Sequence, residues 1–173
     1  MPALYDDLIS TAYGQFYVTS DFDDEPDPTE AFPGQANGLC GAQVPGGLFL
    51  VTGRHDGKVQ LRVELRDGPP PEDGWEEIVE VSFTPVSDEV TLMTWHVDEY
   101  PLPGLQAGVA YRVRYCARGM DEATGYHGPR EGVEPIDHYL LAFWPAPPEA
   151  DRVVRRTSRA AAYWHDEGFT RST

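Results

Sequence analysis

The sequence predicts an all-β protein, an antiparallel β-sandwich of about seven to eight strands with a C-terminal α-helix. Several segments alternate apolar and polar residues with a period of two, as strands with one buried and one solvated face do. Turn signals rich in Gly and Pro separate these segments, at 45–47, 56–57, 68–74 and 101–104. No helical pattern lies between them, which favours a sandwich over an alternating strand–helix fold. A closed barrel is the alternative architecture.

Four segments show the alternation most clearly. Their expected buried sides are Val59, Leu61, Val63 and Leu65 in 58–66, Val79, Val81 and Phe83 in 78–83, Val90, Leu92 and Thr94 in 89–95, and Val109, Tyr111, Val113 and Tyr115 in 109–118. In the last segment Arg112, Arg114 and Arg118 occupy the other side, which we expect to face water. Three further strands are expected over 14–20, 48–53 and 138–144. The last two are apolar on both sides, as strands covered on both faces are.

We expect helices only at the ends of the chain, a short one over 3–11 and a longer one over 149–167. Pro147 and Pro148 stand at the start of the longer helix and Gly168 follows its end, which are common boundary residues. Its apolar stripe consists of Val153, Thr157, Ala160, Ala161 and Trp164. Its second face carries Arg152, Arg155, Arg156 and Arg159.

The chain of 173 residues is about one domain long, since domains commonly hold ~100–150 residues. We assign residues 1–148 to the sandwich and residues 149–173 to a helix and tail packed on the same domain. The first residues have neither a positive segment nor an unbroken apolar one, and no apolar run approaches the ~18 residues of a membrane span. We therefore expect a soluble, cytoplasmic protein.

Charge is the strongest compositional signal. The formal net charge is −16, from 29 acidic and 13 basic residues. Such a charge excludes direct binding to nucleic acid and to anionic membranes, because phosphate binding depends on Lys and Arg. Residues 1–53 hold eight acids and no Lys or Arg, residues 54–150 hold 18 acids and 8 bases, and residues 151–173 hold 3 acids and 5 bases. The chain thus has an acidic head and a basic tail.

The densest acidic segment is 21–30, and its candidate binding residues are Asp21, Asp23, Asp24, Glu25 and Asp27. The alternating acids suggest a calcium loop, but Pro26 stands where the turn needs Gly and Phe32 where the loop needs a bidentate Glu. A helix–loop–helix calcium site is therefore rejected. Three interpretations stay open: a solvated loop stiffened by proline, an irregular cation site, and an acidic contact surface that steers a basic protein partner.

Trp75 is the second candidate binding residue, because it stands among acids in a turn-rich segment. Its ring either packs as a lid on the loop or anchors a protein interface, where Trp is enriched. We expect no catalytic residue, no metal and no cofactor. The sequence has no phosphate-binding motif and no nucleophile motif, and its five histidines lack the spacing of zinc ligands. Cys40 and Cys116 lie in no paired motif, and we expect buried, reduced thiols rather than a disulfide or a reactive cysteine.

The segment Tyr13-Gly14-Gln15-Phe16-Tyr17-Val18 forms a Tyr-x-Gln-Phe-x-Val strand in a small acidic all-β chain. It resembles the start of the competence protein J family, bacterial cytoplasmic inhibitors of a DNA-entry nuclease. A Pro-rich turn ahead of a Tyr-x-Val strand, over 101–115, agrees with the same family in order and kind. The resemblance implies a binding protein without catalysis, and no functional residue of the family is carried over.

Three functional hypotheses follow. The first is a non-catalytic acidic binding protein, an inhibitor or immunity protein for a basic partner such as a nuclease. The second is a sandwich that binds a small molecule or carbohydrate, with or without calcium, through loop aromatics such as Trp75 and Tyr100. The third is an enzyme whose site assembles only in space from His55, His96 or His127 with nearby acids.

Overall fold

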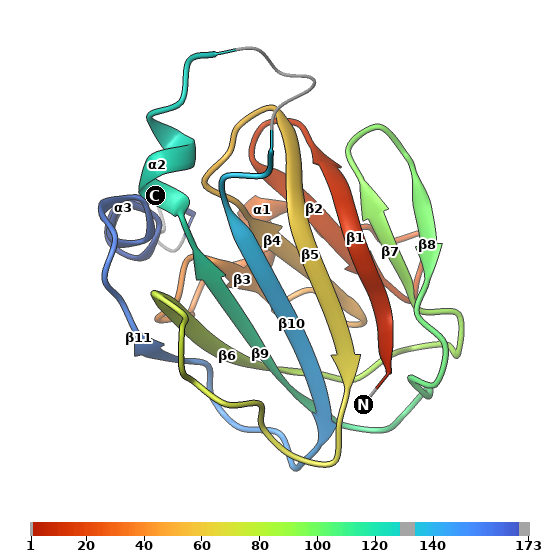
Figure 1. The fold of residues 1–173 in the computed structure, drawn as a ribbon. Coiled ribbons are helices and arrows are strands. Elements are labelled where there is room, and N and C mark those ends of the chain that lie inside the picture. Colours follow the sequence, from red (N-terminus) through yellow and green to blue (C-terminus); the bar gives the residue numbers. More distant parts are fainter. Residues whose placement is uncertain (1, 129–133, 170–173) are drawn as a thin grey trace.

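The protein is described by a computed structural model covering residues 2–128 and 134–169. Within these residues the chain forms two β-sheets and three helices, with the six-stranded sheet in front of the five-stranded sheet in Figure 1. The six-stranded sheet has the order β1(Ala3–Thr11), β5(Gly57–Leu65), β10(His138–Pro145), β9(Tyr111–Arg118), β6(Glu77–Phe83), β11(Arg152–Arg155). The five-stranded sheet has the order β3(Cys40–Gly41), β4(Gly47–Val51), β2(Gln15–Thr19), β7(Thr91–Thr94), β8(Glu99–Pro101). Among these residues no helix is long and apolar enough to cross a membrane.

The facing sides of the two sheets contribute to one hydrophobic cluster. The strands supply alternate residues to it, among them Phe16 and Val18 from β2 and Val113 and Tyr115 from β9. The rings of Phe16 and Tyr115 meet with their centroids 6.1 Å apart. The Tyr115 hydroxyl donates a hydrogen bond of 2.9 Å to the carbonyl of Val51, so a polar contact also joins the sheets.

All seven strands expected from the sequence are present, and the described residues form four more. The two segments with apolar residues on both sides became β4, in which every residue is buried, and β10, in the interior of its sheet. An entirely antiparallel arrangement is wrong for one pair, because β10 runs parallel to β5 while it runs antiparallel to β9. Alternation identifies the buried side of a strand but carries no information on its neighbour or direction.

The expectation of a helix over 3–11 is wrong, because this segment is the edge strand β1. It pairs antiparallel with β5, which places Asp6 opposite Arg62, and the two side chains form an ion pair of 2.7 Å. Ile9 is 1% exposed and joins the core. Pairing with a neighbouring strand therefore overrides the weak local preference for a helix.

The helix expected over 149–167 is shorter than predicted. Its first part is the strand β11, which extends the six-stranded sheet beside β6. The helix α3 (Arg159–Glu167) begins only after Ser158, whose side chain accepts a hydrogen bond from the backbone N–H of Ala161. Two short helices, α1 (Pro28–Ala31) and α2 (Met120–Thr124), were not anticipated by the sequence pattern.

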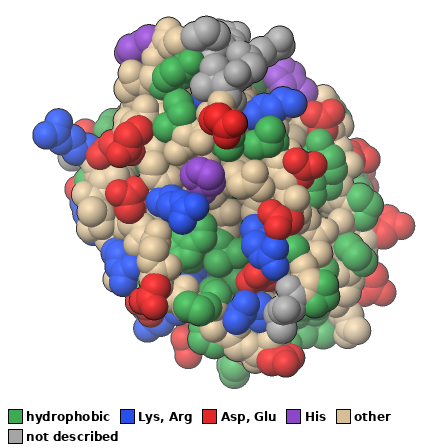
Figure 2. Space-filling view, viewed as in Figure 1, with side chains coloured by type: hydrophobic (Ala, Val, Ile, Leu, Met, Phe, Trp, Pro, Cys, Tyr) green, Lys and Arg blue, Asp and Glu red, His purple; other side chains and the backbone are tan. Residues whose placement is uncertain are grey.

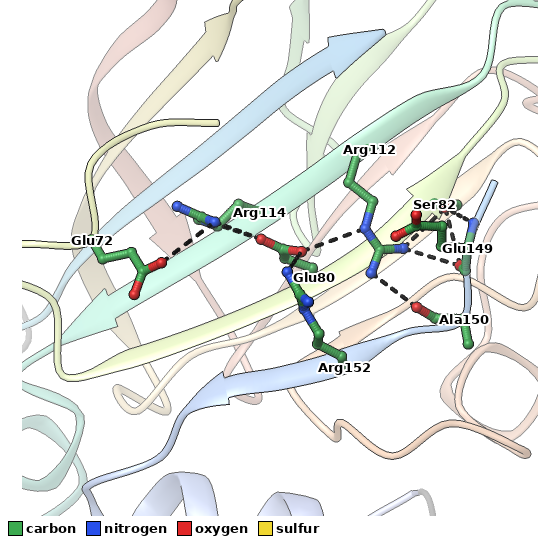
Figure 3. Close-up of polar contacts among 8 residues, drawn as sticks. All are labelled: Glu72, Glu80, Ser82, Arg112, Arg114, Glu149, Ala150 and Arg152. Carbon is green, nitrogen blue, oxygen red and sulfur yellow. Dashed lines mark hydrogen bonds and ion pairs between the residues drawn. The ribbon is translucent and has the colours of Figure 1, made fainter. Parts of the chain in front are cut away.

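Of the three β9 arginines expected to face water, Arg118 is exposed as predicted, but the other two are covered. Arg112 and Arg114 are 3% and 5% exposed. Figure 3 shows both guanidinium groups directed at Glu80 of β6, together with Arg152 of β11. Arg114 donates to one Glu80 oxygen at 2.9 and 2.7 Å, and Arg152 donates to the other at 2.8 Å.

This network ties the edge strand β11 and the residues before it to β6 and β9 of the same sheet. Arg112 also donates to the backbone carbonyls of Glu149 and Ala150, at 3.0 and 2.9 Å. Burial alone would raise the pKa of Glu80, but hydrogen bonds and charges from Arg114 and Arg152 outweigh it and lower that pKa. Part of the predicted basic tail therefore packs on its own chain, beside β6 and β9 of the six-stranded sheet.

Both cysteines, Cys40 and Cys116, are free and buried, as predicted. Burial raises the pKa of the Cys116 thiol to about 12 and also raises that of Cys40. The thiolate, which is the nucleophilic form, is thus disfavoured at both positions.

Candidate functional site

The five-stranded sheet and its connections contain no cationic residue. They consist of two segments far apart in the sequence, 12–53 and 86–110, which supply all five strands. The first segment holds six acids and the second four, and neither contains Lys or Arg. We call these two segments the anionic sheet. Folding therefore adds to the acidic head a second base-free segment that the linear charge distribution did not single out.

The six-stranded sheet differs, because several of its acids form ion pairs with arginines. Arg62 contacts both Asp6 and Glu64 at 2.7 Å, and Arg66 contacts Glu64 at 2.9 Å. Figure 2 shows this face with basic and acidic side chains intermixed. Opposite charges at such distances largely cancel each other's field beyond a Debye length of about 8 Å at physiological salt. The residues outside the anionic sheet hold 19 acids and 13 bases, so the anionic sheet carries −10 of the net charge of −16.

The predicted acidic residues lie in residues 21–27, which we call the acidic loop, between β2 and α1. Two of its carboxylates shape the loop. The Asp21 carboxylate accepts a hydrogen bond of 3.0 Å from the backbone N–H of Asp23. The Asp27 carboxylate caps α1 by accepting from the hydroxyl and N–H of Thr29 at 2.6 and 2.8 Å, which lowers its pKa. Pro26 is buried and packs against Gly47.

The other three carboxylates, those of Asp23, Asp24 and Glu25, belong to exposed residues. None of the five acids of the loop forms an ion pair with a cation among the described residues. The structure thus places the five predicted residues together on one stiffened loop. Among residues 2–128 and 134–169, no group of three or more His, Cys, Asp or Glu side chains could hold a metal ion.

A groove of about 340 Å³ separates the acidic loop from the turn between β7 and β8. Its floor includes Tyr17 and Met93, which are opposite each other in neighbouring strands. Its rims include Glu25 on the loop and Trp95 on the turn. Burial raises the pKa of the Tyr17 hydroxyl, and the charge of Glu25 contributes in the same direction, so Glu25 acts on the groove floor.

Exposed apolar side chains gather beside this groove. Trp95 and Val97 are 50% and 65% exposed, and Tyr13 is 62% exposed. The rings of Tyr13 and Trp95 meet edge to face with centroids 5.2 Å apart. Such exposed clusters beside charged residues are typical of protein interfaces, where aromatic anchors supply much of the binding energy.

Both turns that present these side chains have unusual backbones. Among the described residues, Tyr13 and Val97 are the non-glycine residues with positive φ, at 57° and 66°. Tyr13 occupies a two-residue turn with Gly14, a geometry that suits tight hairpins. Val97 is β-branched, and this conformation is strained for such a residue. Backbone strain of this kind concentrates at functional sites.

Sequence reasoning missed Trp95 and Val97 as site residues. Trp95 was included at the end of an expected strand over 89–95, but β7 ends at Thr94 and the chain then turns. The sequence does contain a weak signal for Trp95 as a binding residue. Asp98 and Glu99 follow it closely, and a Trp beside acids is the pattern that singled out Trp75.

Trp75 itself lies on the six-stranded sheet, away from the acidic loop. Its ring is partly buried against a small cluster on the outer side of that sheet, which includes Ile78, Cys116 and Leu140. The guanidinium of Arg118 lies 5.3 Å above the ring. These contacts are those of a packed lid, and an anchoring role for Trp75 stays a prediction.

The fold has counterparts among solved structures. ComJ from Bacillus subtilis, described as an inhibitor of the DNA degrading activity of NucA, matches with a TM-score of 0.52 at 13% identity. The match covers 84% of this chain and 98% of ComJ. This chain has the ComJ fold. The protein of crocagin biosynthetic gene J also matches, with a TM-score of 0.51 at 15% identity over 85% of this chain and 100% of that one.

The resemblance to the competence protein J family is confirmed at the level of the fold. No protein-family model and no curated protein matches the sequence. In the ComJ fold of this chain, the segment that carried the resemblance forms the turn at Tyr13 and the strand β2. Phe16 and Val18 of that segment enter the core, while Tyr17 lines the groove.

Proposed function

We propose that this protein is a non-catalytic cytoplasmic inhibitor, a β-sandwich that binds a basic protein such as a nuclease through its anionic sheet. The observation that carries the proposal is the absence of Lys and Arg from both segments of that sheet, beside an acidic loop without cationic partners among the described residues. ComJ, a protein with the same fold that inhibits the DNA degrading activity of NucA, supports the same class of function.

The charge arrangement provides a physical route to inhibition. A nuclease attracts phosphates with Lys and Arg side chains at its active site. Carboxylates of Asp23, Asp24 and Glu25 can occupy the positions of those phosphates, because they accept charge-assisted hydrogen bonds from the same donors. A one-signed face also steers association, which raises on-rates about 10-fold to 10³-fold at low salt. No bond in the partner has to be made or broken, so the role requires no catalytic residue.

Capture from the native host tests this proposal. Tagged wild-type protein and a variant with Asp23→Asn, Asp24→Asn and Glu25→Gln are used as baits, and the captured proteins are identified by mass spectrometry. A matched control carries the same charge change elsewhere, as Asp67→Asn, Asp73→Asn and Glu122→Gln, all at exposed positions.

The proposal expects a basic nuclease that wild type and control capture and inhibit, and that the loop variant inhibits at least 10-fold less well. Capture of an acidic partner, or equal inhibition by the loop variant and the control, would overturn it.

A second groove favours the alternative, a protein that binds a small molecule or carbohydrate. This groove of about 710 Å³ lies near α3 and is lined by the aromatic side chains of Tyr13, Tyr163 and Trp164 together with Arg159. Its size falls within the ~300–1,000 Å³ of ligand pockets. Calorimetry with a glycan panel, with and without calcium, tests the alternative. Heats that disappear in a Trp164→Leu variant would support it, and no heat from any ligand would remove it.

A further inference from the structure

We propose that the groove between the acidic loop and the β7–β8 turn binds one Arg or Lys side chain of the protein partner. The inference rests on the proposed function, because it identifies the part of a basic partner that the anionic sheet would recognise. It differs from general charge attraction in naming a single pocket, whose walls are Glu25 and Trp95 and whose floor includes Tyr17.

The size of the groove fits one side chain. Its volume of about 340 Å³ is near the lower end of the ~300–1,000 Å³ range for small-molecule pockets. A folded element such as a helix, about 10–12 Å across with its side chains, would not enter it. An extended side chain from a neighbouring surface reaches the floor without a backbone rearrangement of either protein.

The lining selects a cation. Two carboxylates, those of Glu25 and Asp27, belong to the lining residues, and no Lys or Arg lies anywhere in the two segments that build the sheet. Desolvating a guanidinium or ammonium group is unfavourable unless it gains an opposite charge and hydrogen-bond acceptors. The Glu25 carboxylate supplies the charge. It also accounts for part of the raised pKa of Tyr17, which locates its field at the groove floor.

The aromatic lining favours the same occupant. A cation within about 6 Å of the centre of an indole or phenol ring is attracted by the ring quadrupole. Trp95 and Tyr17 both line the groove, and the rings of Trp95 and Tyr13 meet edge to face. The apolar stem of an Arg or Lys side chain would lie along Met93 and Val97 while its charged head reaches Glu25. Arginine suits the site better than lysine, because its flat guanidinium both stacks on a ring and forms paired hydrogen bonds with a carboxylate.

The first test uses N-acetyl-arginine amide as the probe and N-acetyl-citrulline amide as its uncharged counterpart. The four Trp indole N–H signals are followed by NMR, with the Trp95 signal assigned by its loss in Trp95→Phe. The inference expects a saturable shift of the Trp95 signal with the arginine probe only, weakened at least 5-fold in Glu25→Gln. Glu89→Gln, an exposed acid of the same sheet, is the matched control and leaves the shift unchanged. No shift, or an equal shift with citrulline, would overturn the inference.

A second test separates the inference from the proposed function. With the captured basic partner, Trp95→Ala should accelerate dissociation about 10-fold and leave the association rate unchanged, because it removes a contact made only in the complex. If the partner binds through the acidic loop but Trp95→Ala dissociates like wild type, the pocket is wrong and the inhibitor function stands. If the arginine probe binds but no basic partner is inhibited, the pocket stands and the inhibitor function fails.

Discussion

Acid should destabilise the protein through one histidine. His165 lies in α3, is 6% exposed, and accepts at Nδ1 a hydrogen bond of 2.9 Å from the backbone N–H of Gly38. Burial, with a smaller contribution from Arg156, lowers its pKa from 6.5 to about 4, against opposing effects of Asp166 and Asp151. Protonation would place a second donor against the Gly38 N–H, so the folded state favours the neutral ring.

The sign and size of the pH effect on stability follow from the difference between the folded and unfolded pKa values of His165. Because the folded pKa is lower than the unfolded one, the contribution of His165 to stability is fully present above pH 6.5 and is lost as the pH falls toward 4. For these two pKa values the loss is about 1.4 kcal/mol at pH 5.5 and about 2.5 kcal/mol at pH 4.5.

This loss of stability is measured by urea unfolding, followed by Trp fluorescence, at pH 7.0, 5.5 and 4.5 in wild type and in His165→Gln. The difference in unfolding free energy between the two proteins should shrink by about these amounts, while the control His96→Gln, at an exposed residue, should parallel wild type. Parallel curves for wild type and His165→Gln would refute this account of how α3 docks.

Three further substitutions test the packing by the same unfolding assay. Glu80→Ala should lower the free energy of unfolding by about 3–5 kcal/mol, because it leaves buried arginines unpaired. The control Glu72→Ala, at a side chain 45% exposed, should lower it by less than about 1 kcal/mol. Equal losses would contradict the network in Figure 3. Gly38→Ala should lower the free energy of unfolding by at least about 1–3 kcal/mol, since the new Cβ would lie 1.9 Å from a backbone oxygen of α3. A Cβ at Gly68 meets nothing within 4 Å, so the control Gly68→Ala should leave stability unchanged. Val97→Gly should leave stability unchanged or raise it by up to about 1 kcal/mol, because release of a positive φ offsets the entropy of glycine; a clear loss would show that the turn is not strained.

The strands could be predicted because one physical signal determines them. In β5 and β9, apolar residues such as Val59 and Val113 alternate with polar ones and enter the core, which is what a half-buried strand requires. The parallel pairing of β10 with β5 could not be predicted, since it depends on where a strand inserts between two others. Arg112 and Arg114 were assigned to solvent because charged residues are rarely buried unless they are paired. Ion pairs with Glu80 and hydrogen bonds to backbone carbonyls compensate their burial.

The candidate site was predictable to the same extent. The acids of the loop at 21–27 are adjacent in sequence, so their clustering needed no tertiary information. Predicting the contribution of Trp95 required tertiary information, because its exposure results from the turn that follows β7 and from the neighbouring turn at Tyr13. The helix expected over 149–167 failed for a related reason: four of its residues form the edge strand β11, whose partner β6 lies far away in the sequence.

The central claim, that the anionic sheet binds a basic partner, is tested most directly by the association rate with the captured partner as a function of salt. Rates are measured by stopped flow from 20 to 500 mM NaCl for wild type, the acidic-loop variant and the matched control. The account predicts that wild type and control associate about 10-fold or more faster than the loop variant at low salt, and that the three rates converge at high salt. Equal rates for all three proteins at low salt would contradict it.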